Sequence, residues 1–472
     1  MTFRFLKLAL ACWFAAVGLA SQRALADADV SGLPARPSPD WLRSGTVYEI
    51  FPRDFSAAGN LDGVTARLDA LHSLGVNILW TMPIHPIGKK FRKGEFGSPY
   101  SIADYYAVDS DYGTVADYRR FVSEAHKRDL KVIMDLVVDH TAWDSVMMRH
   151  PEFYRHDAKG KIISPVPAWT DVAALNYENP ALRQYIIAML KYWVTNCDVD
   201  GFRCDAAAMI PTDFWVQARH ELTQIKPDLV LLAEASKPEL LTNAFDIDYS
   251  WPLLSTVRDV LAQKKPSSSI QRSWEESRAH FPKDSLHLRI VDDHDEDRAT
   301  MRFGINRTLA ASALMFTLDG VPLIYNGMET GDRTASSGDA LFDKRTISWQ
   351  SKENPALPGI YQELVQLRHQ YPVLDNSRVE WLHNSSEASL VTFDRADEKD
   401  ELLVAINFSD RPVTAKIDVK NADGFTPLNF AGLPAFQGGR LPTIRLNQYE
   451  WRIFHRSSMV AYPVASLAPA KN

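Results

Sequence analysis

The sequence predicts an α/β fold, a closed (β/α)8 barrel followed by a small antiparallel β domain. Over about three hundred residues, short apolar runs alternate with longer amphipathic segments, as strands and helices do in turn. The short runs number eight and lack polar alternation, which is typical of parallel strands buried on both faces. Eight such units favour a closed barrel over the competing doubly wound open sheet. Beyond residue 374 the pattern changes to period two, which indicates antiparallel strands.

The chain begins with the pattern of a secretory signal peptide. Arg4 and Lys7 precede an apolar run from Leu8 to Ala20, and Ala24-Leu25-Ala26 is a small-x-small cleavage site. The run is shorter than the ~20 residues that a membrane-spanning helix needs. We therefore predict that residues 1–26 are a signal peptide, and that the mature protein is exported to a periplasm or to the medium without binding a membrane.

Composition and charge exclude several classes of function. The 472 residues are 46% hydrophobic and 24% charged, which is the ordinary range of ordered globular proteins. A net charge of −7 argues against nucleic acid as a partner, because nucleic acids bind basic surfaces. Cys12 leaves with the signal peptide, so only Cys197 and Cys204 remain, too few for a disulfide framework or a cysteine metal cluster. We expect a monomer with a neutral partner.

The barrel is predicted over residues 41–374, after a Pro-rich lead-in at 27–40. Its eight strands are predicted at Val47–Phe51, Val76–Met82, Val132–Val138, Gly201–Asp205, Leu229–Glu234, Ala244–Ile247, Leu286–Val291 and Val321–Tyr325. Helices are predicted at Val64–Leu74, Val115–Lys127, Ala181–Val194, Asp213–Ile225, Thr308–Leu318 and Pro355–Gln370. The third strand is followed by residues 141–178, which have no periodicity and contain Trp143 and Trp169. We predict that this segment is an inserted loop domain that faces substrate. Its two tryptophans are candidates for stacking on sugar rings, although aromatic residues of this kind more often serve core or loop packing.

A smaller domain is predicted over residues 375–457. Its strands are expected at Ser389–Phe393, Leu402–Phe408, Val413–Ile417, Thr443–Leu446 and Trp451–Phe454. The remaining residues, 458–472, are rich in Ala, Ser and Pro and are expected to form a mobile tail.

Acidic residues and histidines stand at the ends of four predicted barrel strands. The third strand ends in Asp139-His140, the fourth in Asp205, the fifth in Glu234, and the seventh leads into Asp292-Asp293-His294-Asp295. Because the carboxyl ends of parallel barrel strands meet on one face, these groups are expected to converge there. One such acid is often only a salt-bridge partner, whereas four together indicate a catalytic site.

Two of these acids have the surroundings that glycoside cleavage requires. That reaction needs one ionised carboxylate and one protonated carboxylic acid flanking the bond. Arg203 lies two residues before Asp205 and points the same way in a strand, so it can hold Asp205 ionised as a nucleophile. Glu234 follows only Leu and Ala. Apolar surroundings raise the pKa of a carboxyl group by desolvation, and a raised pKa suits a general acid.

The residues at these strand ends resemble signature segments of the alpha-amylase family, glycoside hydrolase family 13. Four ordered segments carry the resemblance: Asp135-Leu-Val-Val-Asp-His140, Gly201-Phe-Arg-Cys-Asp205, Leu232-Ala-Glu234 and Asp293-His294-Asp295. Flanking segments are also similar, namely Gly75–Pro83, Ser98-Pro-Tyr100 with Asp104-Tyr105, and Gly320–Glu329. The resemblance runs from about Val47 to the β domain and implies a retaining, α-glucan-active enzyme. It implies a (β/α)8 barrel with a loop domain after the third strand and a C-terminal β-sandwich.

The resemblance also implies a role for each matching residue. Asp205 would form the covalent glycosyl intermediate, Glu234 would act first as acid and then as base, and Asp295 would stabilise the transition state. Substrate binding would fall to four further residues: His140 and His294 on sugar hydroxyls, Arg203 orienting Asp205, and Tyr100 stacked on the sugar ring.

The sequence departs from the family pattern at several positions. Asp139 and Asp293 stand where the family usually has Asn, and both add possible negative charge that would raise neighbouring pKa values. Ala208-Met209 replaces a frequent Lys-His pair on the leaving-group side. Calcium often lies between barrel and loop domain in the family, but Ala174 stands where an acid is expected, so Asp139 is the one evident charged ligand. The chemistry itself requires no cofactor.

We therefore predict an exported hydrolase of α-1,4-glucosidic bonds in starch-like glucans or maltooligosaccharides. A transglycosylase or a disaccharide-active enzyme on the same scaffold is the alternative among enzymes. A noncatalytic glycan-binding protein is the alternative of another class, and the intact set Asp205, Glu234 and Asp295 argues against it.

Overall fold

The computed structural model describes residues 29–351, 353–375 and 378–458, and it confirms the predicted α/β TIM barrel with a C-terminal β domain. Eight parallel strands close in the order β1-β10-β9-β8-β7-β6-β3-β2. They are β1 Val47–Ile50, β2 Ile78–Thr81, β3 Lys131–Leu136, β6 Gly201–Cys204, β7 Val230–Ala233, β8 Ile247–Tyr249, β9 Leu286–Arg289 and β10 Val321–Tyr325. The predicted signal peptide and residues 459–472 of the predicted tail lie outside the described residues. Across the described ranges, no helix has the length and apolarity to span a membrane.

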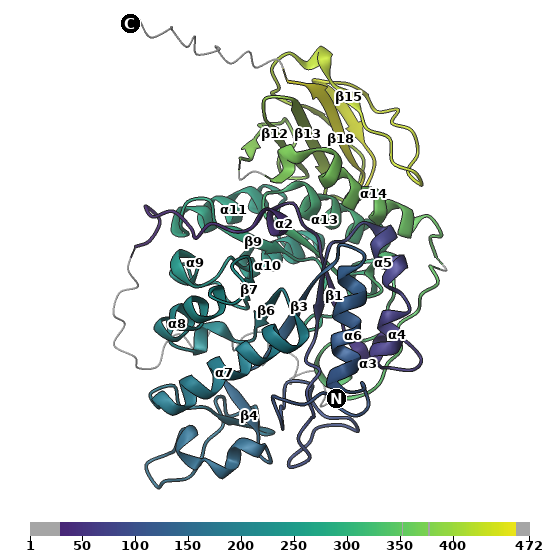
Figure 1. Ribbon diagram of the computed structural model, residues 1–472. Helices are drawn as coiled ribbons and strands as arrows, with labels where there is room; N and C mark the ends of the chain where they lie inside the picture. Colours follow the sequence, from purple (N-terminus) through teal and green to yellow (C-terminus); the bar gives the residue numbers. More distant parts are fainter. Residues whose placement is uncertain (1–28, 352, 376–377, 459–472) are drawn as a thin grey trace, which may run out of the picture.

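Helices surround the barrel (Figure 1). They are α2 Asp40–Arg43, α3 Pro52–Phe55, α4 Leu61–Thr65, α5 Leu68–Leu74, α6 Val115–His126, α7 Pro180–Cys197, α8 Thr212–Thr223, α9 Leu240–Asn243, α10 Trp251–Leu261, α11 Ser268–His280, α12 Ala299–Phe303, α13 Ile305–Thr317 and α14 Leu357–Gln370. The structure differs from the sequence analysis at two neighbouring places in the chain. The strand β8 begins at Ile247, where the predicted strand ended, and α10 and α11 follow it where no helix was predicted. The helix α11 was not predicted because it buries few side chains, namely Ile270, Ser273 and Trp274.

The barrel interior is filled by alternate residues of each strand. An apolar layer occupies the lower part, with Val47, Ile78, Ile133, Val230 and Leu288 among its members. On β1 and β3 the inward position two residues further along is acidic, Glu49 and Asp135, because a strand points every second side chain the same way. Thus the strand period that buries the apolar layer also delivers charged groups to the carboxyl ends of the strands.

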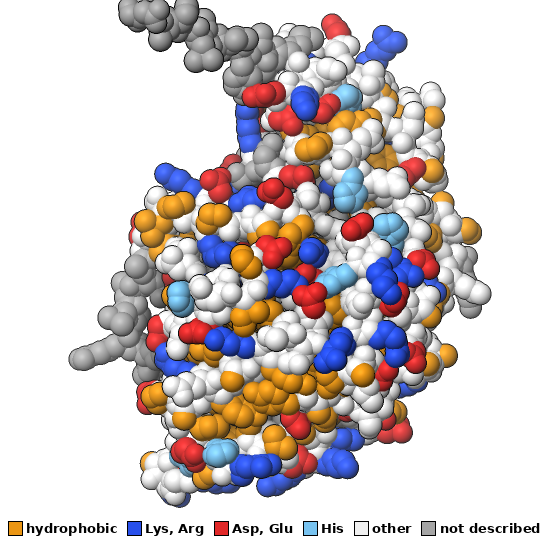
Figure 2. Space-filling view, in the orientation of Figure 1, with side chains coloured by type: hydrophobic (Ala, Val, Ile, Leu, Met, Phe, Trp, Pro, Cys, Tyr) orange, Lys and Arg blue, Asp and Glu red, His pale blue; other side chains and the backbone are white. Residues whose placement is uncertain are grey.

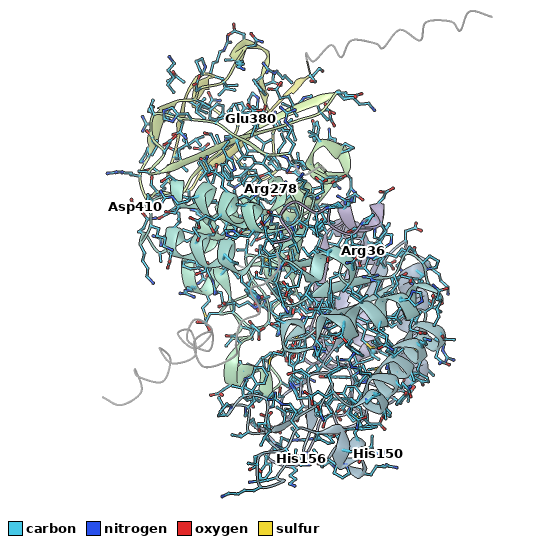
Figure 3. The ribbon with its side chains drawn as sticks, turned by 90° about the vertical axis from the view of Figure 1, so that its left-hand side faces the viewer. Arg36, His150, His156, Arg278, Glu380 and Asp410 are labelled. Atoms are coloured by element: carbon cyan, nitrogen blue, oxygen red, sulfur yellow. The ribbon has the colours of Figure 1, made fainter. Side chains whose placement is uncertain are left out.

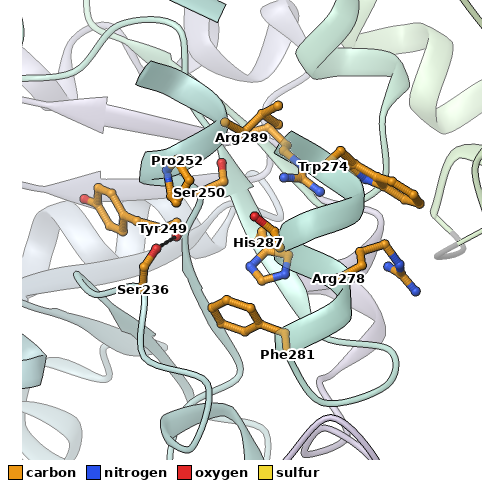
Figure 4. Close-up of a pocket in the computed structure, with 11 residues that line it drawn as sticks. Ser236, Tyr249, Ser250, Pro252, Trp274, Arg278, Phe281, His287 and Arg289 are labelled. Carbon is orange, nitrogen blue, oxygen red and sulfur yellow. Dashed lines mark hydrogen bonds between the residues drawn. The ribbon is translucent and has the colours of Figure 1, made fainter. Parts of the chain in front are cut away.

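A separate small cavity lies on the outer side of strands β8 and β9, against α10 and α11 (Figure 4). Trp274, Phe281 and His287 line it, and its volume of about 10 Å³ has room for about one water molecule. His287 Nδ1 lies 2.5 Å from Asp248 Oδ1. Figure 4 shows the Tyr249 side chain pointing away from His287, toward the barrel interior. The sheet therefore separates this cavity from the polar interior layer.

The inserted segment after β3 contains a two-stranded antiparallel sheet, β4 His140–Ala142 with β5 Val172–Ala174, although no strand was predicted there. Two 3-10 turns, Val146–Arg149 and Pro151–Phe153, lie between these strands. In Figure 1 this segment lies at the end of the molecule opposite the β domain, and Figure 3 places His150 and His156 at its tip. Hydrophobic side chains gather in a band across the lower part of the face in Figure 2, where α7 lies.

The β domain has two antiparallel sheets, as predicted. The strands β11 Glu380–Trp381, β12 Leu390–Ala396, β13 Asp400–Asn407, β18 Trp451–Ser457 and β15 Thr426–Pro427 form one, and β14 Val413–Lys416, β17 Thr443–Leu446 and β16 Gly439–Arg440 form the other. An apolar cluster that includes Leu403, Ile417 and Ile444 fills the space between them. Figure 3 places Arg278 near the boundary with the barrel and Glu380 in the β domain.

A buried arginine connects the β domain to the barrel. Arg395 of β12 is fully buried and donates hydrogen bonds to the carbonyl oxygens of Thr317 at 2.7 Å, Leu374 at 3.1 Å and Val373 at 3.2 Å. These carbonyls belong to the end of α13 and to the turn after α14. Because buried carbonyls need partners, the β domain completes the hydrogen bonding of the barrel.

Candidate active site

Strand register brings the two predicted catalytic carboxylates together at the carboxyl ends of β6 and β7. Arg203 lies opposite Asp135 of β3 on one side and opposite Leu232 of β7 on the other. Asp205 follows Arg203 by two residues and Glu234 follows Leu232 by two, so both point to the same side of the sheet. The site therefore lies where the polar interior layer meets the strand ends.

The guanidinium of Arg203 is the centre of the site. Arg203 is fully buried, and its Nη1 donates to Asp205 Oδ1 at 2.7 Å and to Asp135 Oδ1 at 3.0 Å. Its Nη2 lies 3.1 Å from Glu234 Oε2. Neighbouring nitrogens of one planar group thus hold both predicted catalytic carboxylates, a geometry that a lysine cannot provide.

The backbone after Asp205 turns so that it also contacts Glu234. Ala206 has a φ of 43°, in the left-handed region that favours glycine, and its N–H donates to Glu234 Oε2 at 2.8 Å. Trp215 Nε1 donates to the carbonyl of Ala207 at 3.0 Å and fixes the following turn. The strained backbone at Ala206 therefore helps to position the predicted general acid beside the predicted nucleophile.

The pKa values of the two carboxylates are separated. Burial raises the pKa of Asp205 to about 6, against the opposing effect of Arg203. Burial raises the pKa of Glu234 further, to about 8, and the negative charges of Asp205 and Asp295 add to the effect. Burial therefore outweighs the effect of Arg203 on the pKa of Asp205, which remains low enough for Asp205 to be ionised near neutral pH. The order of the two pKa values, with Glu234 the weaker acid, is as expected.

His140 is positioned by the residue before it. Its Nδ1 lies 2.9 Å from Asp139 Oδ2, and its Nε2 lies 3.0 Å from the carbonyl of Tyr100. Burial lowers the pKa of His140, but Asp139 and Asp205 raise it more, so that it reaches about 9. His140 is therefore a cation near neutral pH, held at the start of β4 beside the predicted nucleophile.

His294 stands on the opposite side of the site. Its Nδ1 lies 2.6 Å from Glu49 Oε1 and its Nε2 lies 2.7 Å from the Tyr100 hydroxyl. The ring of Tyr100 is stacked on that of His294, with centroids 5.3 Å apart. Burial lowers the pKa of His294, whereas Asp295 and Glu49 raise it to about 10. Asp295 itself is exposed at the mouth of the site, with its Oδ2 3.3 Å from His294 Nε2.

The two acids that replace Asn in the family pattern have different environments. Asp293 is fully buried, and its Oδ1 accepts from the backbone N–H of Asp295 at 3.1 Å. Burial, followed by the charge of Asp295, raises the pKa of Asp293 well above its usual value and favours its neutral form. Asp139, by contrast, is among the charges that raise the pKa of Asp205.

Three polar residues of the site were not assigned a role from the sequence. Glu49 of β1 contacts His294, Asp135 of β3 contacts Arg203, and Trp80 of β2 donates from Nε1 to Asp135 Oδ2 at 3.1 Å. A signal existed for the two acids: each is a lone charge within an apolar strand, at an inward position. Their partners lie on other strands, so periodicity alone does not identify what they contact.

A metal site at Asp139 lacks suitable ligands among the described residues. Asp139, His140 and Asp205 bring one ligand atom each within 4.8 Å of one another, and Asp139 Oδ1 is buried without a hydrogen bond. However, His140 Nδ1 already contacts Asp139, and Asp205 contacts Arg203. Calcium takes six to eight oxygen ligands, and an imidazole and a nucleophilic carboxylate do not fit that set.

Comparison with known proteins gives a consistent result. The family model described as "Alpha amylase, catalytic domain" matches residues 27–158 and 168–357. The chain is 27% identical over 413 residues to "Alpha-amylase MalA" of Haloarcula japonica, covering 81% of this chain and 58% of that protein. It is 26% identical to "Neopullulanase 2" of Thermoactinomyces vulgaris, covering 83% of this chain and 74% of that protein. Among solved structures, a maltogenic alpha-amylase from Thermotoga neapolitana is similar with a TM-score of 0.79 and 28% identity, covering 88% of this chain and 99% of that one.

Proposed function

Because the chain belongs to the alpha-amylase family of glycoside hydrolases, we propose that it hydrolyses α-1,4-glucosidic bonds of maltooligosaccharides and starch-like glucans with retention of configuration. One observation carries the proposal. A single buried guanidinium, that of Arg203, contacts both Asp205 and Glu234, whose pKa values are about 6 and about 8. Between these values one carboxylate is ionised and the other is protonated, as the reaction requires.

The first half of the proposed reaction uses both carboxylates. Glu234 donates its proton to the glycosidic oxygen as the bond from that oxygen to the anomeric carbon breaks. Asp205 forms a bond to the same carbon from the opposite face and gives a covalent glycosyl-enzyme. Retention requires carboxyl groups ~5–5.5 Å apart, and attachment of both to one guanidinium supports such a separation.

The second half of the reaction releases the sugar. A water molecule attacks the anomeric carbon, Glu234 accepts its proton, and the bond to Asp205 breaks. His140 and His294, cationic near neutral pH, bind sugar hydroxyls through the ring nitrogens that contact Tyr100 when no sugar is bound. Asp295, exposed beside His294, accepts from hydroxyls of the same ring.

The printed names of similar proteins support the choice of substrate. They describe an alpha-amylase, a neopullulanase and a maltogenic alpha-amylase. We further propose that residues 1–26 are cleaved on export to the periplasm or medium, and that the mature protein acts as a monomer. N-terminal sequencing of the exported protein tests the first point, and light scattering tests the second.

Product analysis of the purified protein tests the function. Soluble starch, maltoheptaose and maltose are each incubated with the wild-type chain and with Glu234→Gln. We expect short oligosaccharides of retained anomeric form, followed by NMR, and loss of these products with Glu234→Gln. Products longer than the substrate would indicate transglycosylation instead. Binding of maltoheptaose without turnover would contradict the proposed hydrolysis and indicate a glycan-binding role.

A further inference from the structure

Phe91 is the most exposed large hydrophobic side chain among the described residues, at 61%. Its φ of 61° also lies in the left-handed region, which is unfavourable for a bulky aromatic residue. An exposed apolar ring and a strained backbone both destabilise the folded protein. Positions that combine such features are concentrated where ligands bind.

The segment around Phe91 is fixed by its neighbours on both sides. The backbone N–H groups of Lys89 and Lys90 donate to Asp144 Oδ2 at 2.8 and 3.1 Å, and Arg92 Nε donates to the carbonyl of Gly88 at 3.0 Å. Gly88 permits this approach, since a Cβ there would lie 2.3 Å from Ala142 Cβ. The segment therefore holds Phe91 in its strained and exposed position.

Lysines on both sides of Phe91 contribute to the same surface. Lys93 Nζ is 2.7 Å from Asp171 Oδ1, which ties the segment to the inserted loop. Lys90 Nζ lies 5.5 Å from the ring centroid of Phe91 and 6.0 Å from that of Trp143. A cation beside two aromatic rings offers donors for hydroxyl groups next to apolar faces for sugar rings.

Two aromatic pairs, joined through the backbone at Thr170, lie between Phe91 and His140. The Phe91 ring lies edge-on to Trp143, with centroids 6.2 Å apart. Trp143 Nε1 donates to the carbonyl of Thr170 at 3.0 Å, and the adjacent Trp169 lies edge-on to His140, with centroids 5.6 Å apart. Trp143 directly follows β4 and is three residues beyond His140, which begins that strand, so the two residues are at most about 10 Å apart along the chain.

We propose that Phe91 and Trp143, with Lys90, form a distal sugar-binding subsite for glucan units beyond those at the reacting bond. The occupant is the far part of the same α-glucan chain, because Trp143 follows His140 by three residues and its indole is hydrogen-bonded to Thr170, next to the Trp169 that contacts His140. The subsite gives the protein a preference for long over short glucans. This inference rests on the proposed substrate class, although it does not require turnover.

Binding measurements test the subsite without catalysis. Isothermal titration calorimetry compares maltoheptaose binding to Glu234→Gln with binding to Glu234→Gln carrying Phe91→Ala. We expect the Kd to rise about five- to tenfold with Phe91→Ala, because one aromatic stacking contact contributes about that factor to the binding affinity. Phe91→Tyr should restore the affinity. An unchanged Kd with Phe91→Ala, or no binding of maltoheptaose by Glu234→Gln, would overturn the proposal.

A matched control and a stability measurement separate binding from folding. Leu33 is 50% exposed, and its carbonyl accepts a hydrogen bond from the backbone N–H of Lys283. Lys283 lies just before β9 begins, so Leu33 lies at the face of the barrel opposite the carboxyl ends of the strands. Leu33→Ala should leave the Kd unchanged. Phe91→Gly relieves the left-handed strain and should match or raise the Tm while weakening maltoheptaose binding. A lower Tm with Phe91→Gly would indicate a structural role and overturn the proposal.

Turnover separates failure of the subsite from failure of the proposed function. In the active protein, we expect Phe91→Ala to lower the ratio of kcat/KM for maltoheptaose to kcat/KM for maltotriose about five- to tenfold. An unchanged ratio overturns the subsite and leaves the hydrolase proposal intact. If the wild-type chain cleaves no glucan but binding still depends on Phe91, the hydrolase proposal fails and the subsite is supported.

Discussion

His294 Nδ1 lies 2.6 Å from Glu49 Oε1, although 245 positions separate the two residues in the chain. Glu49 is fully buried on β1, the first barrel strand, and His294 follows β9, the seventh. The contact therefore reaches past β10, which lies between β1 and β9 in the barrel. Of the two anionic groups that raise the pKa of His294 to about 10, Glu49 is the buried one. This pair therefore keeps the buried imidazole of His294 charged.

Replacing Glu49 by Gln should lower the pKa of His294, because a neutral amide no longer favours the imidazolium. Histidine NMR titration of Glu49→Gln measures the change directly. We also expect a stability loss of about 1 kcal/mol, since the buried hydrogen bond to His294 becomes weaker when its acceptor carries no charge. Glu329→Gln is a matched control, because Glu329 is another buried acid of the barrel that contacts Tyr48 rather than a histidine. An unmoved His294 titration in Glu49→Gln would contradict the role assigned to this pair.

The rate of hydrolysis should depend on pH in a bell shape with limbs near 6 and 8. Asp205, with a pKa of about 6, must be ionised, so kcat/KM falls as the pH decreases through that value. Glu234, with a pKa of about 8, must be protonated, so kcat/KM falls as the pH rises through that value. Initial rates on maltoheptaose from pH 4 to 10 give the profile. A single limb, or an optimum below the lower value, would exclude this pair of protonation states.

Replacing Asp139 by Asn should move the acidic limb to lower pH. Asp139 is a negative charge that raises the pKa of Asp205, and the substitution removes that charge while keeping the shape. The pKa of His140 should fall as well, because Asp139 is its strongest anionic partner. Asp157→Asn, in an exposed turn of the same inserted segment, should leave the profile unchanged. An acidic limb that stays in place in Asp139→Asn would show that burial alone sets the pKa of Asp205.

Replacing Arg203 by Lys should lower kcat by about a hundredfold or more. A lysine keeps the positive charge but cannot contact Asp135, Asp205 and Glu234 from one plane. Arg289→Lys is the matched control, because Arg289 is also a buried strand arginine but faces Asp319 outside the barrel interior. That control should lower the Tm while retaining kcat. Equal kcat losses in the two variants would assign the effect to folding rather than to positioning.

Chelation should change neither the rate nor the Tm. Within the described residues the group around Asp139 offers an imidazole and the nucleophile rather than a full set of oxygen ligands. Activity and thermal unfolding measured after EDTA treatment, and again with added calcium, check this expectation. A rise in Tm on adding calcium would support the metal site that the family pattern suggests at Asp139.

The repeating barrel and the ends of its strands could be predicted from the sequence because both depend on local patterns. Apolar runs at strand spacing mark the barrel, and a charge directly after such a run marks Asp205 or Glu234. The partners of these groups could not be predicted in the same way. Glu49 and Asp135 act through residues on other strands, and only the closed sheet with its register brings them together.

The pKa values show a second limit of the sequence. The order of the pKa values of Asp205 and Glu234 follows from the arginine near Asp205 and from the apolar residues before Glu234, and both are visible in the sequence. The upward shift at Asp205 follows from its burial in the assembled barrel and from the charges of Asp139 and Asp135. Desolvation is a property of the assembled surface, so a local pattern underestimates it.

Arg395 has a consequence for how the molecule unfolds. Its three hydrogen bonds reach carbonyl groups of the barrel from a strand of the β domain. If the chain were cut before that strand, these buried acceptors would lose their donor and the interface of α13 would meet water. We therefore expect removal of the β domain to destabilise the barrel, because buried carbonyls without a donor oppose folding.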